Sequence, residues 1–351
     1  MSSDTAGPET IDALNARAAI AGTLAFRVGP GGLWFADVHN ADATATVCLQ
    51  GGQVLHWQPR GQAVPVLWLS DTARYVPGTA IRGGIPVCWP WFGAAPAVPA
   101  GAAPLPAHGF ARTRPWRVAQ TRALAGGQTQ LCLRLAPTPE SLALWPGRFS
   151  LELQLTVGAE LELTLVTANT GGVPLRISEA LHTYFRIGAI DAIGVHGLAQ
   201  APYFDAVLGR EVAAVAPAGS AQRGDGADDG AIRFAGEVDR VYDAGGACRI
   251  TDPILGRTIE LAATGAASTV VWSPGEAKAQ RLGDLAAAMP PGPASAGDWR
   301  SMVCVESGNA RHRAVEVAAG DCHALGVRYR VASDGAGATA HGRPRRELEA
   351  E

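Results

Sequence analysis

A single cation, Arg82, lies in a segment of glycines, prolines and aromatic rings over residues 81–93, which reads Ile-Arg-Gly-Gly-Ile-Pro-Val-Cys-Trp-Pro-Trp-Phe-Gly. An arginine presents a planar fork of donors that suits phosphate or carboxylate. Glycine allows a backbone to approach a ligand closely, and proline fixes the path of a loop. Trp89, Trp91 and Phe92 offer flat apolar walls of the kind on which sugar rings stack. The segment is therefore either a ligand-binding loop or a rigid packed loop with a solvated arginine.

Two side chains suited to proton transfer occur in apolar surroundings. Glu306 follows the apolar run 301–305, and a carboxylate beside a buried strand is costly unless it is paired or used in chemistry. His182 lies in the apolar and aromatic run 179–185. The structural alternatives are a glutamate that caps the next loop and a histidine that is satisfied within the core.

Further polar groups occur in two other clusters. His108 follows a stretch rich in Pro, Ala and Gly and precedes Arg112 by four residues, whereas Asp239 is adjacent to Arg240. A loop histidine bonded to backbone and a surface ion pair of little energetic value are the alternatives for these groups. Taken with Glu306 and His182, they indicate acid–base chemistry on an anionic polar ligand.

Other classes of site lack their signatures. The sequence has no Gly-x-Ser-x-Gly elbow, no phosphate-cradling P-loop and no Gly-x-Gly-x-x-Gly after a strand. The 6 cysteines form no CxxC pair and the remaining histidines are isolated, so we expect buried thiols, no metal and no cofactor. A net charge of −3 gives no electrostatic reason to bind nucleic acid or an anionic membrane. With no long apolar run and no apolar leader, a cytoplasmic location is expected. No feature decides the oligomeric state, and a monomer is the default expectation.

The elements that must position these groups are predicted to be strands. Leucines alternate with polar residues over 151–157 and again over 161–165 across Gly158-Ala159, which predicts a hairpin with one apolar face. Many short strands separated by glycine or proline, with few helices, are typical of an antiparallel all-β sandwich or barrel. Further strands are predicted at 45–49, 130–135, 173–179, 231–234, 247–251, 257–262, 268–272, 301–306 and 323–331, and helices at 139–144 and 276–286.

The hydrophobic content of 47% is ample for a core. With no evident linker, we expect one β-sandwich domain over residues 21–332. Residues 1–20 are expected to be flexible, and residues 333–351 to form a disordered tail because they lack apolar periodicity.

The clusters occur in an order that resembles the hexose-6-phosphate mutarotase branch of the aldose 1-epimerase family. The matching segments cover roughly residues 30–330. They are Arg-Gly-Gly-Ile-Pro-Val-Cys-Trp-Pro-Trp-Phe-Gly (82–93), His-Gly-Phe-Ala-Arg (108–112), Glu-Ala-Leu-His-Thr-Tyr-Phe (179–185), Asp-Arg-Val-Tyr (239–242), Val-Val-Trp-Ser-Pro with Lys-Ala (270–279) and Met-Val-Cys-Val-Glu-Ser-Gly-Asn-Ala (302–310). Where the family often has glutamine before the second segment, this chain has Ala107.

The resemblance implies a galactose-mutarotase-like antiparallel β-supersandwich with few short helices. It also implies interconversion of the α and β anomers of an aldohexose 6-phosphate, most typically glucose 6-phosphate, without a cofactor. The family's acid and base carry over onto His182 and Glu306. In the same way, its substrate contacts carry over onto Arg82, Arg112 and Asp239, and His108 matches a second active-site histidine.

Two other functions remain open on sequence grounds. One is a non-catalytic carbohydrate-binding or sugar-sensing protein on the same fold, because fold does not fix function. The retention of both His182 and Glu306 argues against it, since a binder needs no acid–base pair. The other is a glycoside hydrolase or lyase, which would need a second carboxylate or lyase residues that the sequence does not identify.

Overall fold

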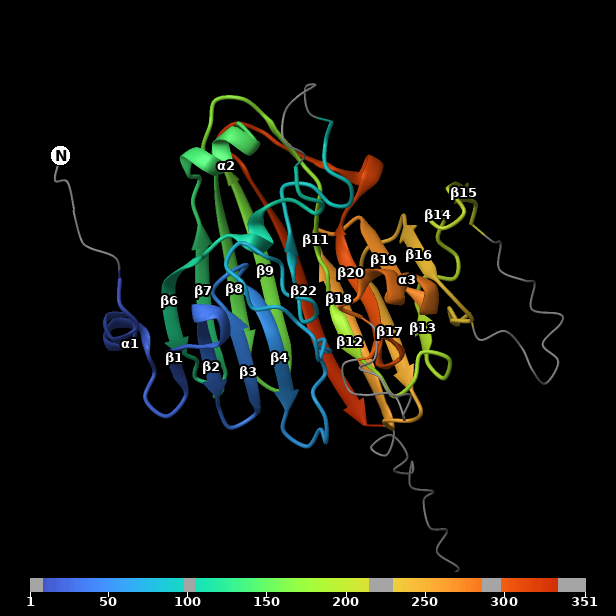
Figure 1. Ribbon diagram of the computed structural model, residues 1–351, viewed down its shortest axis with the longest axis horizontal. Coiled ribbons are helices and arrows are strands. Elements are labelled where there is room, and N and C mark those ends of the chain that lie inside the picture. The colour runs from blue at the N-terminus through green and yellow to red at the C-terminus, as the bar shows by residue number, and fades with distance from the viewer. Residues whose placement is uncertain (1–8, 98–104, 215–229, 286–297, 334–351) are drawn as a thin grey trace, which may run out of the picture.

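Antiparallel strands make up most of the computed structural model, which describes residues 9–97, 105–214, 230–285 and 298–333. One sheet has 8 strands and crosses the molecule behind the others in Figure 1. Its order is β13 (Gly194–His196), β17 (Ala247–Asp252), β18 (Arg257–Thr264), β22 (Cys322–Ser333), β9 (Leu161–Asn169), β8 (Phe149–Val157), β7 (Thr129–Leu135) and β6 (Arg117–Ala123).

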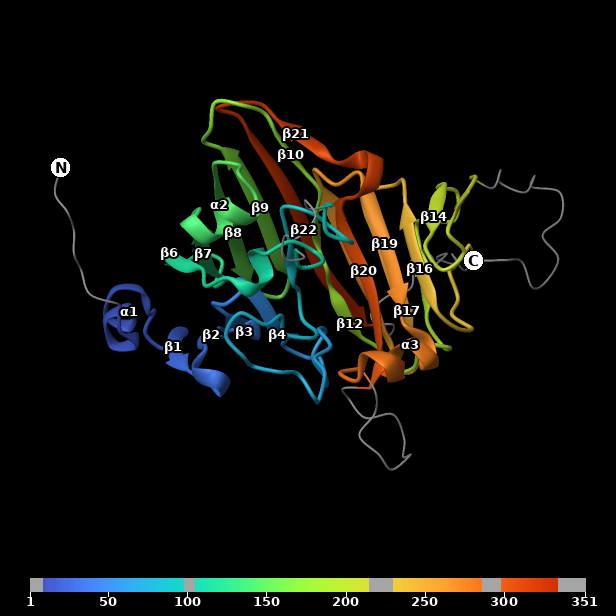
Figure 2. The same ribbon diagram turned by 45° about the horizontal axis from the view of Figure 1, so that its top comes forward.

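A second 8-stranded sheet carries most of the chemically capable residues. Figure 2 shows its central strands β16, β19 and β20 side by side. The order is β15 (Arg210–Val212), β14 (Tyr203–Asp205), β16 (Val238–Tyr242), β19 (Ser268–Ser273), β20 (Met302–Asn309), β11 (Glu179–Leu181) and β5 (Val87–Cys88), and β12 (Tyr184–Arg186) also pairs with β20.

Smaller elements complete the fold. A 4-stranded sheet contains β1 (Leu24–Val28), β2 (Trp34–His39), β3 (Ala43–Cys48) and β4 (Gln53–Pro59), and a 2-stranded sheet contains β10 (Leu175–Ile177) and β21 (Val315–Val317). The helices are α1 (Ile11–Ala18), α2 (Pro139–Leu144) and α3 (Gly275–Leu282), with short 3₁₀ turns at Pro30–Gly32, Ala111–Thr113, Trp299–Ser301 and Arg311–Arg313. None of the helices within the described ranges has the length and apolarity needed to cross a bilayer.

The apolar faces of these sheets share one core. Alternate residues of β8 and β9, including Leu153, Leu155 and Leu163, are buried with Val47 of β3 and Val305 of β20 in a single hydrophobic cluster. Because side chains alternate between the two faces of a strand, the period-two leucine pattern places one complete face of the β8–β9 hairpin in this core. The sequence prediction of an all-β antiparallel fold is therefore confirmed.

Most of the predicted strands are present, with shifts of one to four residues at their ends. The segment 173–179 divides into β10 and the start of β11 at Ser178. The segment 231–234 forms no strand and makes only an isolated bridge, between Ile232 and Val195. The helix predicted at 276–286 ends earlier, because Gly283 takes a left-handed φ of 71° as the C-cap of α3.

The N-terminal segment differs from the prediction of a flexible stretch over residues 1–20. Residues 11–18 form α1, whose N-cap Thr10 accepts a hydrogen bond from the backbone N–H of Ala13. Leu14 and Ala18, four residues apart on one helix face, are buried in the core. Residues 1–8 and, at the other end, 334–351 of the predicted tail lie outside the described residues.

Candidate active site

A cavity of about 600 Å³ lies over β16, β19 and β20. Its volume is in the range that small-molecule sites occupy. Its lining combines acids, bases, cations and rings: Arg82, Phe92, Gly93, Ala94, His108, Ser178, His182, Tyr184, Phe204, Ala206, Asp239, Val241, Val270, Trp272, Lys278, Glu306 and Arg311. Five of the six predicted site residues, Arg82, His108, His182, Asp239 and Glu306, are in this lining; the sixth, Arg112, is not.

Strand register explains why residues far apart in sequence meet here. Glu306 of β20 lies opposite Val270 of β19, and Trp272 of β19 lies opposite Asp239 of β16. Residues two apart on a strand share a face, so Val270 and Trp272 point to the same side as Glu306. β20 continues past the predicted end of its apolar run, so Glu306 lies inside a strand whose eight residues are all buried.

His182 lies between β11 and β12, both of which pair with β20. Its backbone N–H donates to the carbonyl of Pro86 at 3.0 Å, which ties it to the loop that carries Arg82. Its ring stacks on Tyr184, with centroids 4.8 Å apart and 10° between the planes, and meets the edges of His108 and Trp272. The imidazole is therefore held in a fixed orientation by rings around it.

His182 and Glu306 form a buried pair. Nε2 of His182 lies 3.3 Å from Oε1 of Glu306, whose side chain is 1% exposed. The other polar atoms of the pair, Nδ1 of His182 and Oε2 of Glu306, have no hydrogen-bond partner within the described part of the chain. Buried polar atoms without partners are costly. Beside a ligand-sized cavity, such atoms are typical of a site in which a bound substrate supplies the missing hydrogen bonds.

Burial shifts the pKa values of both partners in favour of their uncharged forms. It raises the pKa of the Glu306 carboxyl well above its ordinary value; the charge of Asp239 acts in the same direction and that of Arg112 against it. It lowers the pKa of the His182 imidazole well below its ordinary value, and His108, Arg112 and Arg82 add to that effect. Both shifts favour a protonated carboxyl beside a neutral imidazole at the expense of the ion pair, so Glu306 gains proton affinity and His182 loses it.

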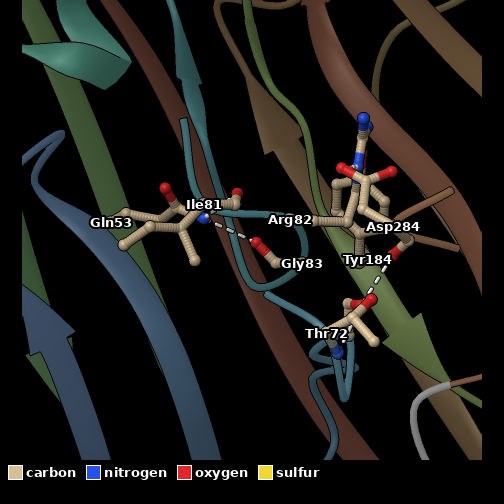
Figure 3. Close-up of polar contacts among 8 residues, drawn as sticks. Gln53, Thr72, Ile81, Arg82, Gly83, Tyr184 and Asp284 are labelled. Carbon is tan, nitrogen blue, oxygen red and sulfur yellow. Dashed lines mark hydrogen bonds and ion pairs between the residues drawn. The ribbon is translucent and has the colours of Figure 1, made fainter. Parts of the chain in front are cut away.

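Arg82 reaches the cavity while engaged with two side chains (Figure 3). Its Nε donates to Oδ2 of Asp284 at 3.0 Å, and Nη1 donates to the hydroxyl of Tyr184 at 3.0 Å. Interaction with Tyr184 is the largest influence that raises the Arg82 pKa, and Asp284 adds to it against the effect of burial. Arg82 is thus a permanent cation at the cavity, next to the residue that stacks on His182.

Close backbone approach explains two glycines near these residues. Gly84 has φ 62°, and a Cβ there would clash with the carbonyl oxygen of Val54. Gly109 has φ 70°, and a Cβ there would clash with the carbonyl oxygen of Trp89. Both positions need glycine for conformation and for space.

The aromatic rings of the same loop divide between packing and lining. Trp89 is fully buried and donates from Nε1 to Oγ1 of Thr167, and Trp91 donates to the carbonyl of Pro106. Phe92, in contrast, lines the cavity. Of the three rings considered from the sequence, the two tryptophans pack the loop and the phenylalanine faces the ligand space.

His108 and Arg112 occupy different places. His108 has a left-handed φ of 60°, and its Nδ1 accepts a hydrogen bond from the Gly93 backbone N–H at 3.3 Å. Burial lowers the pKa of His108 to about 4, with Arg112 and Arg82 adding to the shift, so the ring is neutral near pH 7. Arg112 lies beside the cavity rather than in its lining, and Nη2 donates to the carbonyl of Ala107.

Asp239 faces the cavity beside Lys278, which is not among the site residues predicted from the sequence. Nζ of Lys278 lies 2.7 Å from Oε1 of Glu237 and 3.5 Å from Oδ2 of Asp239. Burial raises the pKa of Asp239, and Lys278 opposes that shift. Lys278 belongs to α3, which starts just after β19. The Val-Val-Trp-Ser-Pro segment that leads into this helix was the sequence feature that could have indicated Lys278.

One group of possible metal donors comes together in the described part of the chain. Atoms of His182, Cys304 and Glu306 lie within 4.8 Å of one another. Cys304 and Glu306 are two apart on β20 and share a face. Imidazole, thiolate and carboxylate are all zinc ligands. Two of the three, however, are the predicted acid–base pair, and Cys304 is absent from the cavity lining.

Size alone does not single out this cavity. A second hollow of about 470 Å³ lies under α1 and is lined by Leu14, Leu33, Trp34 and Trp116 among others. Its lining contains no histidine, and its single carboxylate is Glu9, which is paired with Arg17. The chemistry of the lining therefore favours the cavity that contains His182 and Glu306.

Relatives of known sequence share most of this chain. An Escherichia coli K12 protein is 34% identical over 271 residues, which cover 77% of this chain and 81% of that protein. A protein of the plant Cenchrus ciliaris is 32% identical over 273 residues, covering 75% of this chain and 74% of its own length. Both carry the name "putative glucose-6-phosphate 1-epimerase".

Solved structures share the fold. The crystal structure of a Salmonella typhimurium protein, titled "a putative mutarotase (YeaD)", aligns with a TM-score of 0.74 at 30% identity over 92% of this chain and 99% of that one. A galactose mutarotase-like protein from Clostridium acetobutylicum aligns with a TM-score of 0.65 at 11% identity, over 88% of this chain and 98% of that one. The predicted galactose-mutarotase-like fold is thereby confirmed.

The model of the aldose 1-epimerase family matches residues 36–330. That span contains every residue of the cavity lining, and it agrees with the extent of the resemblance seen in the sequence. The chain belongs to the aldose 1-epimerase family.

Proposed function

We propose that this protein interconverts the α and β anomers of an aldohexose 6-phosphate, with D-glucose 6-phosphate as the substrate. The observation that carries the proposal is the buried His182–Glu306 pair, 3.3 Å apart, in a cavity that also contains Arg82 and two further cations. The pair supplies proton transfer, and the cations favour an anionic sugar over a neutral one.

Ring opening needs one base and one acid. Glu306, as the carboxylate, removes the proton from the anomeric hydroxyl, and His182, as the imidazolium, protonates the ring oxygen. The C1–O5 bond then breaks and an open-chain aldehyde forms. Rotation about C1–C2 presents the other face of the aldehyde to O5. Ring closure reverses the transfers: His182 takes the proton from the O5 hydroxyl, and Glu306 returns one to O1.

The shared burial of the two groups supports this reversal. An acid and a base of very different proton affinity would favour one direction of transfer and slow the other. Burial raises the pKa of Glu306 and lowers that of His182, which opposes the ordinary preference of the proton for the imidazole. The pair holds one proton in total, and the substrate determines on which partner that proton resides.

Other residues of the cavity are proposed to orient the sugar. Asp239 accepts hydrogen bonds from sugar hydroxyls, and the neutral His108 contacts the sugar from its place beside His182. Arg82 is proposed as a phosphate contact, since it lines the cavity and remains charged. Arg112 was predicted to share this role, but its place behind the lining supports action through its charge on His182 and Glu306.

Exchange spectroscopy by NMR tests the proposal. The rate of α–β exchange is measured with the purified protein for glucose 6-phosphate, glucose and galactose at equal concentrations. We expect strong acceleration with glucose 6-phosphate and weaker acceleration with the free sugars. A lack of acceleration with all three would support a non-catalytic sugar-binding protein on the same fold. Equal acceleration of free and phosphorylated glucose would remove the phosphate role of Arg82.

A further inference from the structure

Arg311 is a cation of the cavity that the mechanism above does not use. It follows the buried Ala310, which comes directly after β20, the strand that carries Glu306. Its φ is 57°, in the left-handed region that residues with a Cβ enter only at a cost. Strained backbone of this kind is concentrated at ligand sites, where it aims a side chain. Here it accompanies a guanidinium that lines the ligand space.

Two cross-strand neighbours hold the Arg311 side chain. Phe204 of β14 and Glu211 of β15 lie directly opposite each other in the antiparallel pair, so they share a face. The guanidinium carbon of Arg311 lies 3.5 Å from the centre of the Phe204 ring, and Nη2 lies 3.0 Å from Oε1 of Glu211. The ring fixes the plane of the guanidinium, while the carboxylate occupies one edge of its fork.

The other cations of the lining, Arg82 and Lys278, each interact with two side chains of the protein. Arg82 is bound to Asp284 and Tyr184, and Lys278 is bound to Glu237 and Asp239. The carboxylate partners of these two are 28% exposed, whereas Glu211 is 64% exposed. An exposed ion pair contributes little free energy. Arg311 can therefore exchange its carboxylate for a dianionic ligand at a lower cost than Arg82 or Lys278.

We propose that Arg311 binds the phosphate group of the substrate, leaving Glu211 and remaining stacked on Phe204. This inference rests on the proposed function. A planar guanidinium can donate two parallel hydrogen bonds to a phosphate. Because Glu306 within β20 and Arg311 just beyond its end line the same cavity, a single ligand can contact both. Arg311 thus selects the phosphorylated sugar, while the His182–Glu306 pair acts on its anomeric carbon.

The test compares R311N with the wild type in the NMR exchange assay, with separate kcat and KM values for glucose 6-phosphate and for glucose. Asparagine tolerates a left-handed φ, so the variant removes the charge and keeps the turn. We expect the ratio of kcat/KM for glucose 6-phosphate to that for glucose to fall roughly 10- to 100-fold, mainly through the KM of the phosphorylated sugar. R311K should recover part of the loss as a point charge.

Two controls separate a binding role from a structural one. Arg313, two residues further on, pairs with Asp243 at 3.6 Å and is outside the cavity lining, so R313N should leave the ratio unchanged. E211Q frees Arg311, and the KM for glucose 6-phosphate should fall about 2- to 5-fold. If R311N keeps the wild-type ratio, Arg311 does not bind the phosphate, although the proposed function stands. If the wild type itself fails to accelerate glucose 6-phosphate, the proposed function fails and this inference with it.

Discussion

Two glutamate–histidine pairs with buried carboxylates lie close together, and their glutamates are on neighbouring strands. Glu306 of β20 pairs with His182, and Glu179 of β11 pairs with His323 of β22, at 3.3 Å and 2.9 Å. Both carboxylates are almost fully buried. The strands β11 and β20 are neighbours, and Glu179 lies opposite Asn309, three residues beyond Glu306. Residue type and burial alone therefore do not distinguish a reacting pair from a structural one.

The surroundings make the difference. Asn309 donates to Glu179 and contacts Nε2 of His323, so the second pair has an additional polar partner, although Oε2 of Glu179 has none within the described residues. The hydrogen bond to Glu179 is the main cause that raises the pKa of His323, which favours a charged imidazolium. In the first pair, burial dominates and lowers the pKa of His182. A pair with additional partners becomes an ion pair, whereas a pair facing a cavity remains able to exchange its proton.

The largest predicted difference between the two pairs is in the exchange rate. H182Q removes the proton donor to the ring oxygen, so exchange of glucose 6-phosphate should fall about 10²- to 10⁴-fold. H323Q, the same change in the other pair, should keep the rate within a few-fold. Measured kcat values from NMR exchange decide between the two pairs, and equal losses in both variants would mean that His182 has no special role.

The pH profile sharpens the same contrast. The pair of His182 and Glu306 must hold one proton, and this state extends from the lowered pKa of the imidazole to the raised pKa of the carboxyl. Exchange should therefore persist above pH 6.5, the ordinary histidine value. An unperturbed pair would instead lose about tenfold per pH unit there, as the imidazolium deprotonates. The rate is followed from pH 7 to 9, where the phosphate stays dianionic, with H323Q as the control of unchanged profile.

Thermal stability should report on the second pair. The pKa of His323 is raised in the folded state, so its contribution is fully present below the unfolded value of 6.5 and is lost as pH rises through the folded value. H323Q should lower the Tm by roughly 2–4 °C at pH 6 and by less at pH 9. Calorimetric melts at both pH values measure this difference. A deficit that grows with pH would contradict the ion pair between Glu179 and His323.

The smallest effect is expected for a substitution of Tyr184, whose ring stacks on that of His182. Y184F keeps the ring that stacks on the imidazole and removes the hydroxyl that accepts from Arg82. The exchange rate should fall about 2- to 10-fold, the value of one hydrogen bond. Steady-state kinetics on glucose 6-phosphate measure it. A loss as large as that of H182Q would show that the hydroxyl of Tyr184, rather than its ring, is needed for proton transfer.

The sequence predicted the frame of the site well, because its strands have regular alternation and its motifs are local. Glu306 and His182 could be singled out as candidates from their apolar surroundings and from the family resemblance, and the structure brings them together. β10 and β11 were read as one strand, because the break at Ser178 carries neither glycine nor proline. α1 was missed although Thr10 and Asp12 are typical of a helix start, since only Leu14 and Ala18 bury a face.

At other positions the contacts depend on long-range strand pairing, which the sequence does not reveal. Arg311 enters the cavity because β14 and β15 place Phe204 and Glu211 against it, about a hundred residues away in sequence. The run Arg311-His312-Arg313 after the Glu306 strand was the only local signal. Likewise, no local pattern separates Glu179 from Glu306, because strand register is what places Asn309, the additional partner, against Glu179.

The most direct measurement compares E306Q with E179Q in the NMR exchange assay on glucose 6-phosphate, with a thermal melt of each variant. Both substitutions remove a buried carboxylate of nearly the same exposure from adjacent strands. We predict that E306Q loses about 10²- to 10⁴-fold in rate while it remains folded. E179Q should lose stability and keep most of its rate per folded molecule. Near-wild-type exchange by folded E306Q would contradict the assignment of Glu306 as the base.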